Sequence, residues 1–282
     1  MKKIQYFILT KSIGLYLNSI SYFNPEKAKS KAYKLFSQPR KGKLKQNHLP
    51  KTLQNATKET FKFQNESFQT YKWQGDDSSV LLIHGWESNS SRWKKLLPFL
   101  KSTGKTIFAI DGPAHGLSGG KEFNAPKYAE YIHAVMQKYP SEIVIGHSIG
   151  GAAIAYYLHK YKNSAIQKVV LLGSPSDFKI ISNNFVSLLS LNKKIKSLLE
   201  QYYQEKFDIP IDDFAGHLFA TYFSQKALIA HDEDDKIVSV NEGRKYASTW
   251  KNATYIETKG HGHSLHDNDL YKSIVSFITD GK

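Results

Sequence analysis

The sequence predicts an α/β fold with a mostly parallel sheet flanked by helices. The first observation is a series of short, continuous apolar runs, which is typical of strands that are covered on both faces. The second is that helical stretches separate these runs, as expected for parallel strands joined by crossover helices. The third is a pair of segments with alternating apolar and polar residues ahead of the runs, which predicts an antiparallel hairpin that leads into the sheet.

Residues 1–57 are expected to form an N-terminal helical arm and linker. Helix is predicted for residues 1–38 in two parts that divide at Asn24-Pro25. The longest uncharged run, Ser12 to Pro25, has 14 residues, fewer than the ~20 that a bilayer span needs. The arm is therefore not predicted to cross a membrane, and a lysine within the apolar stretch makes a signal peptide the less favoured interpretation.

The positive charge of the chain is concentrated in this arm. Residues 1–50 hold eleven basic residues against the single acid Glu26, so they carry +10 of the net charge of +14 and leave +4 for the other 232 residues. Such an arm is compatible with a solvated helix that packs on the body or with peripheral contact to an anionic membrane. Nucleic acid is the least favoured partner, since nothing in the sequence resembles a zinc finger, an RNP motif or a basic-region zipper.

The core is predicted from residues 58–173 and 224–282. Residues 60–64 and 68–73 form the expected hairpin, and the crossover helices are expected at Ser91–Leu100, Ala125–Lys138 and Ile149–Tyr161. The predicted parallel strands are Val80–Ile83, Thr106–Ile110, Ile143–Ile145, Val169–Leu172 and Ala227–Ala230.

The alternation of strands and helices breaks at residues 174–223, which are expected to be helical throughout. An insertion between two strands lies at the carboxyl ends of the sheet, where ligands bind in open α/β folds. We therefore expect a helical lid, with a purely structural cap as the alternative.

Gly146-His147-Ser148-Ile149-Gly150 lies where a predicted strand meets a predicted helix. A serine between two glycines at such a turn can be held on a strained elbow with its hydroxyl above the sheet edge. The missing Cβ atoms let strand and helix pass close to each other. This pattern predicts that Ser148 is a nucleophile, and the N–H of Ile149, at the start of the helix, is predicted to stabilise an oxyanion.

Five segments together resemble the α/β-hydrolase superfamily of serine hydrolases, over about residues 58–280. They are HGW at 84–86, DGPAHGLSGG at 111–120, GHSIGG at 146–151, HDEDDKIVSV at 231–240 and GHGHS at 260–264. The resemblance implies an α/β-hydrolase fold and a Ser-His-Asp triad. It also implies that the N–H of Trp86, after the His-Gly pair, is the second oxyanion donor.

The same resemblance selects the base and the acid. It implies His263 as the base, with His261 second and His266 as a further neighbour in the sequence. It implies Asp235 as the acid, among the competing carboxylates of Asp232, Glu233 and Asp234, although Asp232 stands where the family usually has glycine. Asp177, after the preceding strand, is the alternative acid.

Asp111 and His115, in the segment that resembles the loop after the fourth strand of the family, are expected to be structural. The triad explains the clustered histidines and acids without a metal, and no phosphate-binding or dinucleotide-binding fingerprint occurs, so no cofactor is expected. The chain has no cysteine, which excludes disulfides and cysteine nucleophiles.

The sequence thus predicts a cytoplasmic or membrane-peripheral serine hydrolase of the esterase or lipase kind. Its expected substrate is a small-molecule carboxylic ester with a hydrophobic or acyl-chain part, cleaved through an acyl-enzyme. An acyltransferase or thioesterase with the same triad is the alternative within enzymes. A ligand-binding protein with a vestigial triad is the alternative outside them.

Overall fold

The computed structural model describes residues 2–280 and contains one mixed, mostly parallel sheet of eight strands, as the sequence predicts. The strands follow the spatial order β1-β2-β4-β3-β5-β6-β7-β8. Antiparallel pairing is confined to β1–β2 and β2–β4, and the remaining neighbours are parallel. The strands are β1 (Thr57–Phe63), β2 (Glu66–Trp73), β3 (Ser79–Ile83), β4 (Thr106–Ile110), β5 (Ile143–His147), β6 (Lys168–Leu172), β7 (Lys226–Asp232) and β8 (Ala253–Thr258).

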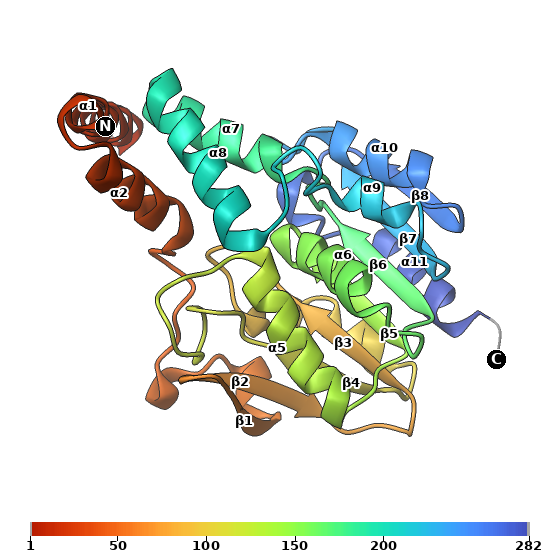
Figure 1. Ribbon diagram of the computed structural model, residues 1–282. Coiled ribbons are helices and arrows are strands. Elements are labelled where there is room, and N and C mark those ends of the chain that lie inside the picture. The colour runs from red at the N-terminus through yellow and green to blue at the C-terminus, as the bar shows by residue number, and fades with distance from the viewer. Residues whose placement is uncertain (1, 281–282) are drawn as a thin grey trace. The chain divides into compact units, whose positions relative to one another are not determined.

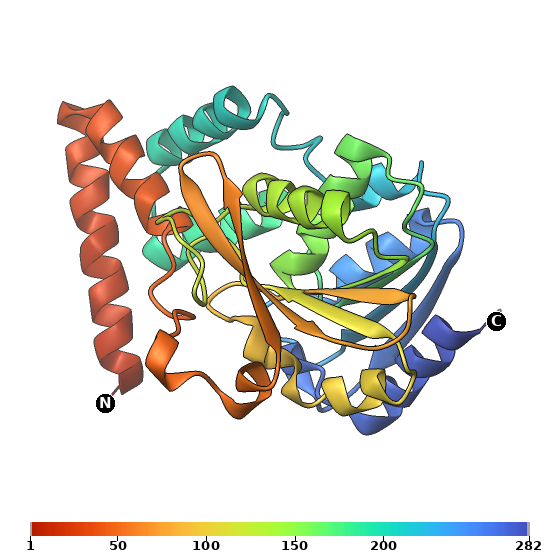
Figure 2. The same ribbon diagram turned by 90° about the horizontal axis from the view of Figure 1, so that it is seen from below.

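Helices cover both faces of this sheet (Figures 1 and 2). One face carries α5 (Ala125–Lys138), α6 (Ile149–Tyr161), α9 (Gly216–Ala220) and α10 (Val240–Thr249). The opposite face carries α3 (Lys51–Gln54), α4 (Leu97–Lys101) and α11 (Asn268–Thr279). Strands β3, β4 and β5 are buried along their whole length, which explains why their sequences are continuously apolar.

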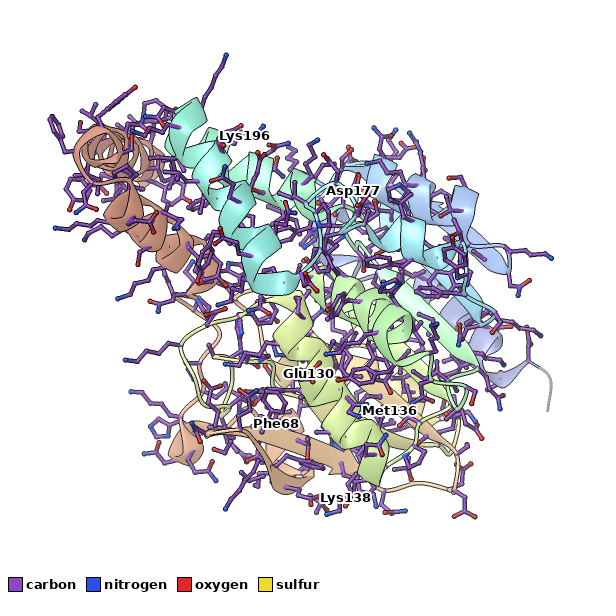
Figure 3. The ribbon with its side chains drawn as sticks, viewed as in Figure 1. Phe68, Glu130, Met136, Lys138, Asp177 and Lys196 are labelled. Carbon is purple, nitrogen blue, oxygen red and sulfur yellow. The ribbon has the colours of Figure 1, made fainter. Side chains whose placement is uncertain are left out.

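Side chains alternate between the two faces of the strands. Leu82, Ile145 and Leu228 belong to the core cluster that also contains residues of α4 and α11. The hairpin closes one edge of the sheet and carries Phe68 (Figure 3). Phe68 of β2 stacks on Tyr131 of α5, with ring centroids 4.1 Å apart. Burial of these apolar faces is the main contribution that holds the sheet and its helices together.

Two expectations for the core are wrong in detail. The single helix expected at Ser91–Leu100 is instead a 3₁₀ turn, Ser90–Lys94, followed by α4, with Pro98 in the first turn of that helix, where its missing N–H is tolerated. Strand β8 was not expected, because it is a partly buried edge strand without a long apolar run. A 3₁₀ turn, Gly262–Ser264, connects β8 toward α11.

The N-terminal arm is helical in two parts, as predicted: α1 (Lys2–Phe23) and α2 (Pro25–Ser37). The break follows from the sequence, because the Asn24 side chain caps α2 and Pro25 begins it. Met1, the first residue of the signal-like segment, lies outside the described residues. None of the described helices combines the length and the hydropathy needed to cross a bilayer.

These two helices form a compact unit with part of the insertion. The unit contains the residues up to Gln38 together with Asp177–Ala215, and the sheet belongs to the unit of Pro39–Ser176 and the residues from Gly216 onward. The first unit packs α1 and α2 against α7 (Phe178–Leu189) and α8 (Lys193–Phe207) around Leu17, Tyr33, Leu189, Ile195 and Tyr203.

The insertion is not helical throughout, because the chain leaves helical conformation between α8 and α9, where Pro210 lies. Its function as a lid, and the boundaries expected at residues 57, 173 and 223, stay predictions.

Candidate active site

Ser148 lies on a sharp turn between β5 and α6. Its backbone has φ 54° and ψ −132°, a conformation that is costly for a residue with a side chain. The close approach of neighbouring backbone explains the flanking glycines: a Cβ on Gly150 would lie 2.3 Å from the carbonyl oxygen of Ile83. The elbow expected from the sequence is therefore present, and it holds the nucleophile candidate at the carboxyl end of a central strand.

The Ser148 hydroxyl lies next to His263, in the 3₁₀ turn after β8. His263 Nε2 is 3.0 Å from Ser148 Oγ, and His263 Nδ1 is 2.7 Å from Asp235 Oδ2. Because Nδ1 faces a carboxylate, it carries the proton, which leaves Nε2 as an acceptor for the serine hydroxyl. The three side chains thus form one hydrogen-bonded chain from three separate loops.

Asp235 is fixed by the loop after β7. Its Oδ1 accepts hydrogen bonds from the N–H groups of Ile237 and Val238, at 2.8 and 3.0 Å. His231 Nε2 lies 3.3 Å from Oδ2 and 3.0 Å from the Val238 carbonyl, so this nitrogen also carries a proton. Burial alone raises the pKa of Asp235, but the hydrogen bonds from His231, His263 and Val238 outweigh it and hold the pKa well below its usual range.

The neighbouring acids have other partners. Asp232 is buried and accepts hydrogen bonds from the Thr258 hydroxyl and from the backbone N–H groups of His261 and Gly262. These bonds hold the turn that leads into His263. Asp234 accepts from the Gly260 N–H, and Glu233 pairs with Lys259 on the surface.

Asp177 lies at the N-terminal end of α7 (Figure 3) and pairs with Ala215 in an isolated β-bridge. The other two candidate histidines also have separate partners. His266 Nδ1 is 2.6 Å from the Tyr271 hydroxyl, and His261 lies 4.0 Å from an oxygen of Asp267. Of the candidates weighed from the sequence, Asp235 and His263 are therefore the two that line up with Ser148.

Sequence reasoning missed two residues that hold His263 in place. His147 Nε2 lies 2.7 Å from the His263 carbonyl oxygen, and Arg92 Nη2 donates to the Ser264 carbonyl oxygen at 2.9 Å. Burial first, and the Arg92 guanidinium second, lower the pKa of His147 well below its usual value. His147 could have been selected from the sequence, because it lies next to Ser148 in the serine motif. No sequence pattern marks Arg92.

The expected oxyanion donors flank the nucleophile. Ile149 is the first residue of α6, so its N–H has no partner within the helix. Trp86 directly follows Gly85, where an added Cβ would lie 2.8 Å from Ser148 Cβ, so the loop passes beside the nucleophile. Neither N–H has a hydrogen-bond partner within residues 2–280, and both are free to donate to a developing negative charge.

Asp111 and His115 shape the neighbouring loop, in keeping with the structural function expected for them. Asp111 accepts from the Tyr71 hydroxyl and from the N–H groups of Ser90 and Leu117. His115 Nε2 accepts from the Glu87 N–H, and its Nδ1 lies 2.8 Å from the Pro113 carbonyl. Their polar atoms are thus occupied by loop backbone and by Tyr71.

In the part of the chain that the structure describes, no group of three or more His, Asp or Glu side chains is arranged to hold a metal ion. The expectation that the protein needs no cofactor stays a prediction.

Comparisons with known proteins agree with this architecture. A family model described as alpha/beta hydrolase fold matches residues 78–207. A bifunctional esterase/perhydrolase from Acinetobacter calcoaceticus is 24% identical over 263 residues, which cover 73% of this chain and 94% of that protein.

Two solved structures share the fold at low sequence identity. The bromoperoxidase from Bacillus anthracis has a TM-score of 0.62 at 17% identity and covers 79% of this chain and 100% of its own. A thioesterase domain from the curacin biosynthetic pathway has a TM-score of 0.59 at 16% identity and covers 79% of this chain and 98% of its own.

The fold and these relatives define a class of protein: the chain has the α/β-hydrolase fold, and the family model for that fold matches residues 78–207. Its esterase and hydrolase relatives support a hydrolase.

Proposed function

We propose that the protein is a serine hydrolase that cleaves a carboxylic ester through an acyl-enzyme. The observation that carries this proposal is the hydrogen-bonded chain from Ser148 through His263 to Asp235, with Ser148 on a strained elbow. A serine hydroxyl alone is a poor nucleophile, and it needs a base in contact and a stabilised oxyanion. Both requirements have candidates within the same loops.

In the first half of the reaction, Ser148 Oγ attacks the ester carbonyl carbon while His263 Nε2 takes the hydroxyl proton. The oxyanion of the tetrahedral intermediate accepts hydrogen bonds from the N–H groups of Ile149 and Trp86. The carboxylate of Asp235 stabilises the imidazolium that forms. The intermediate then expels the alcohol, which takes the proton from His263, and the acyl group remains on Ser148.

In the second half, water replaces the alcohol. His263 removes a proton from the water as its oxygen attacks the acyl carbon, and the same two N–H groups bind the second oxyanion. Collapse of this intermediate breaks the bond to Ser148 Oγ, returns the proton from His263 to that oxygen and releases the carboxylic acid.

We propose a hydrophobic acyl part for the substrate. Trp86, next to the proposed oxyanion site, packs its ring against His115 and Phe123, with ring centroids 5.7 and 5.5 Å away. An aromatic cluster of this kind favours apolar groups over charged ones. Rates with a series of esters of increasing acyl length test the preference, and a rate that falls steadily from acetate upward would contradict it.

Labelling with a fluorophosphonate probe, read by intact mass, tests the nucleophile. The natural chain is expected to gain one adduct and to hydrolyse a small soluble ester, and Ser148→Ala is expected to lose both while its melting temperature stays close to that of the natural chain. An adduct that persists in Ser148→Ala would place the nucleophile elsewhere. A natural chain that neither reacts with the probe nor cleaves any ester would favour the ligand-binding alternative.

The acyltransferase and thioesterase alternatives differ only in the acceptor or the leaving group. One of the solved structures with this fold is a thioesterase domain, but at 16% identity the likeness supports the fold alone. Product analysis with water, an alcohol and an amine in competition, and with ester and thioester substrates compared, separates the three activities. Predominant acyl transfer at low acceptor concentration would overturn hydrolysis as the main reaction.

A further inference from the structure

Helix α1 has a face that its own unit covers and an opposite face that is exposed. The covered face contains Thr10, Gly14, Leu17 and Ser21, all buried. Its packing is tight, because a Cβ on Gly14 would lie 1.6 Å from the carbonyl oxygen of Leu189. This face accounts for the packing of α1 against its neighbours.

The opposite face of α1 carries two rows of large apolar side chains, each spaced by seven residues or about two helical turns, and the exposed polar residues Gln5, Ser12 and Ser19 lie between the rows. One row is Ile8, Leu15 and Tyr22, and the other is Leu9, Tyr16 and Phe23. These six side chains are between 49% and 90% exposed. Single exposed apolar residues need no explanation, but six large apolar side chains gathered in a patch on one face of a helix indicate an interaction surface.

The patch is concentrated in this one element. Of the thirteen exposed large hydrophobic side chains in the described residues, nine belong to α1. Because so many exposed apolar side chains share one helix, a further surface is expected to cover these rows.

Lysine side chains border the patch. Lys31 of α2 lies 5.6 Å from the ring centroid of Tyr16, and Lys194 of α8 lies 5.4 Å from that of Tyr22. Helix α1 contains no acidic residue. An apolar helical face with aromatic residues, bordered by cations, is the pattern of helices that lie in the interface of an anionic membrane.

We propose that the outward face of α1 docks on the surface of an anionic lipid bilayer, with α1 parallel to the membrane plane. The two apolar rows would enter the boundary between headgroups and acyl chains, and Lys31 and Lys194 would meet anionic headgroups. A dimer through the same face is disfavoured, since two-fold symmetry would bring these lysines of one copy toward those of the other. This proposal does not rest on the proposed function.

Sedimentation of the full chain with lipid vesicles tests the docking. The natural chain is expected to bind phosphatidylcholine vesicles that contain phosphatidylserine, and to bind them less at high salt. The double variant Leu15→Ser/Phe23→Ser, one change in each row, is expected to lose at least about tenfold in partition coefficient. Lys31→Ala/Lys194→Ala is expected to lose about 25-fold on the anionic vesicles, since each lysine near such a surface contributes a factor of about five.

A matched control comes from the sheet-bearing unit. Leu218 and Tyr222 are also exposed, at 42% and 88%, but lie outside α1. The double variant Leu218→Ser/Tyr222→Ser is therefore expected to bind as the natural chain does. Far-ultraviolet circular dichroism and hydrolysis of a soluble ester, the latter only if the natural chain shows it, are expected to be unchanged in the α1 variants.

Three results would overturn the proposal. They are equal binding of the natural chain and the Leu15/Phe23 variant, equal binding to neutral and anionic vesicles, and an absence of vesicle binding. If the natural chain is a dimer in light scattering and the Leu15/Phe23 variant is a monomer, the patch is an interface between copies instead.

Discussion

Asp232, Glu233, Asp234 and Asp235 are consecutive acids with different partners. Asp235 contacts His263, while Asp232 holds the turn before that histidine through the N–H groups of His261 and Gly262. Both carboxylates have a pKa below the usual value, because hydrogen bonds to the charged form outweigh burial. A depressed pKa therefore does not by itself distinguish the acid that contacts the base from the acid that positions it.

Asp235→Asn is expected to lower kcat by about four orders of magnitude, because the amide cannot hold the Nδ1–H tautomer of His263 or stabilise the imidazolium. Asp177→Asn is the control and is expected to leave kcat unchanged, since Asp177 lies at the start of α7 and does not belong to the hydrogen-bonded chain of Ser148. Steady-state kinetics with a soluble ester measures both. The opposite pattern would move the acid to Asp177.

The sequence selected Ser148 and, through the family resemblance, His263 and Asp235, and His263 lies within hydrogen-bonding distance of both other side chains. Their catalytic function stays a prediction. The sequence did not predict that Arg92 and His147 hold the His263 segment. Arg92 is 172 residues from its partner Ser264, and His147 is 116 residues from His263. Such contacts depend on how the loops meet in space, and no local pattern encodes them.

Helix α6 and the loop after β3 meet at the elbow without room for an added side chain. A Cβ on Gly150 would lie 2.3 Å from the Ile83 carbonyl oxygen and 2.5 Å from that of His84. Both are backbone atoms, so they cannot turn away as a flexible side chain can. The loop that carries Trp86 would have to move.

Gly150→Ala is accordingly expected to lower the free energy of unfolding by about 1–3 kcal/mol and to reduce kcat, through displacement of the Trp86 N–H. Urea unfolding and steady-state kinetics measure the two effects. Ala152→Ser, a small change at a half-buried position of the same helix, is the control and is expected to alter neither by much. A Gly150→Ala variant with normal stability and rate would show that the elbow has more space than its geometry indicates.

Elements with a strong local signal were predicted closely. The ranges of α5 and α6 agree with the expected helices, and the buried strands were recognised from continuous apolar runs. Two elements with weaker sequence patterns were mispredicted, each for a physical reason. β8 is half-buried at the sheet edge and lacks such a run. A new helix begins at Leu97, with Pro98 in its first turn, where a single helix from Ser91 was expected.

The association of α1 and α2 with α7 and α8 is a property of the whole molecule. Phe36 of α2 contacts Phe178 and Phe185 of α7, with ring centroids 5.9 and 5.2 Å apart, although they are far apart in the sequence. Amphipathic patterns show that each helix has an apolar face, but they do not specify its partner. The sequence therefore predicted that these segments are helical, but it did not predict which helices pack against each other.

Buried histidines make the stability of the molecule depend on pH, and His84 and His115 add to the effect of His147. Burial lowers the pKa of His84 to about 4 and that of His115 to about 3. Both stay neutral in the folded state at pH values where the unfolded chain, with a histidine pKa of about 6.5, already binds protons. The stability they contribute is thus complete above about pH 6.5 and is lost as the pH falls toward 4.

The free energy of unfolding is therefore expected to decrease between pH 7 and pH 5, with a slope to which His84, His115 and the buried His147 each contribute up to about 1.4 kcal/mol per pH unit. Urea unfolding at a series of pH values measures this slope. His115→Asn, which keeps a donor for the Pro113 carbonyl, is expected to be less stable at pH 7 yet to show a shallower slope, because one of these groups no longer titrates. Equal stability at pH 7 and pH 5, or an unchanged slope in the variant, would mean that protons enter these sites in the folded state.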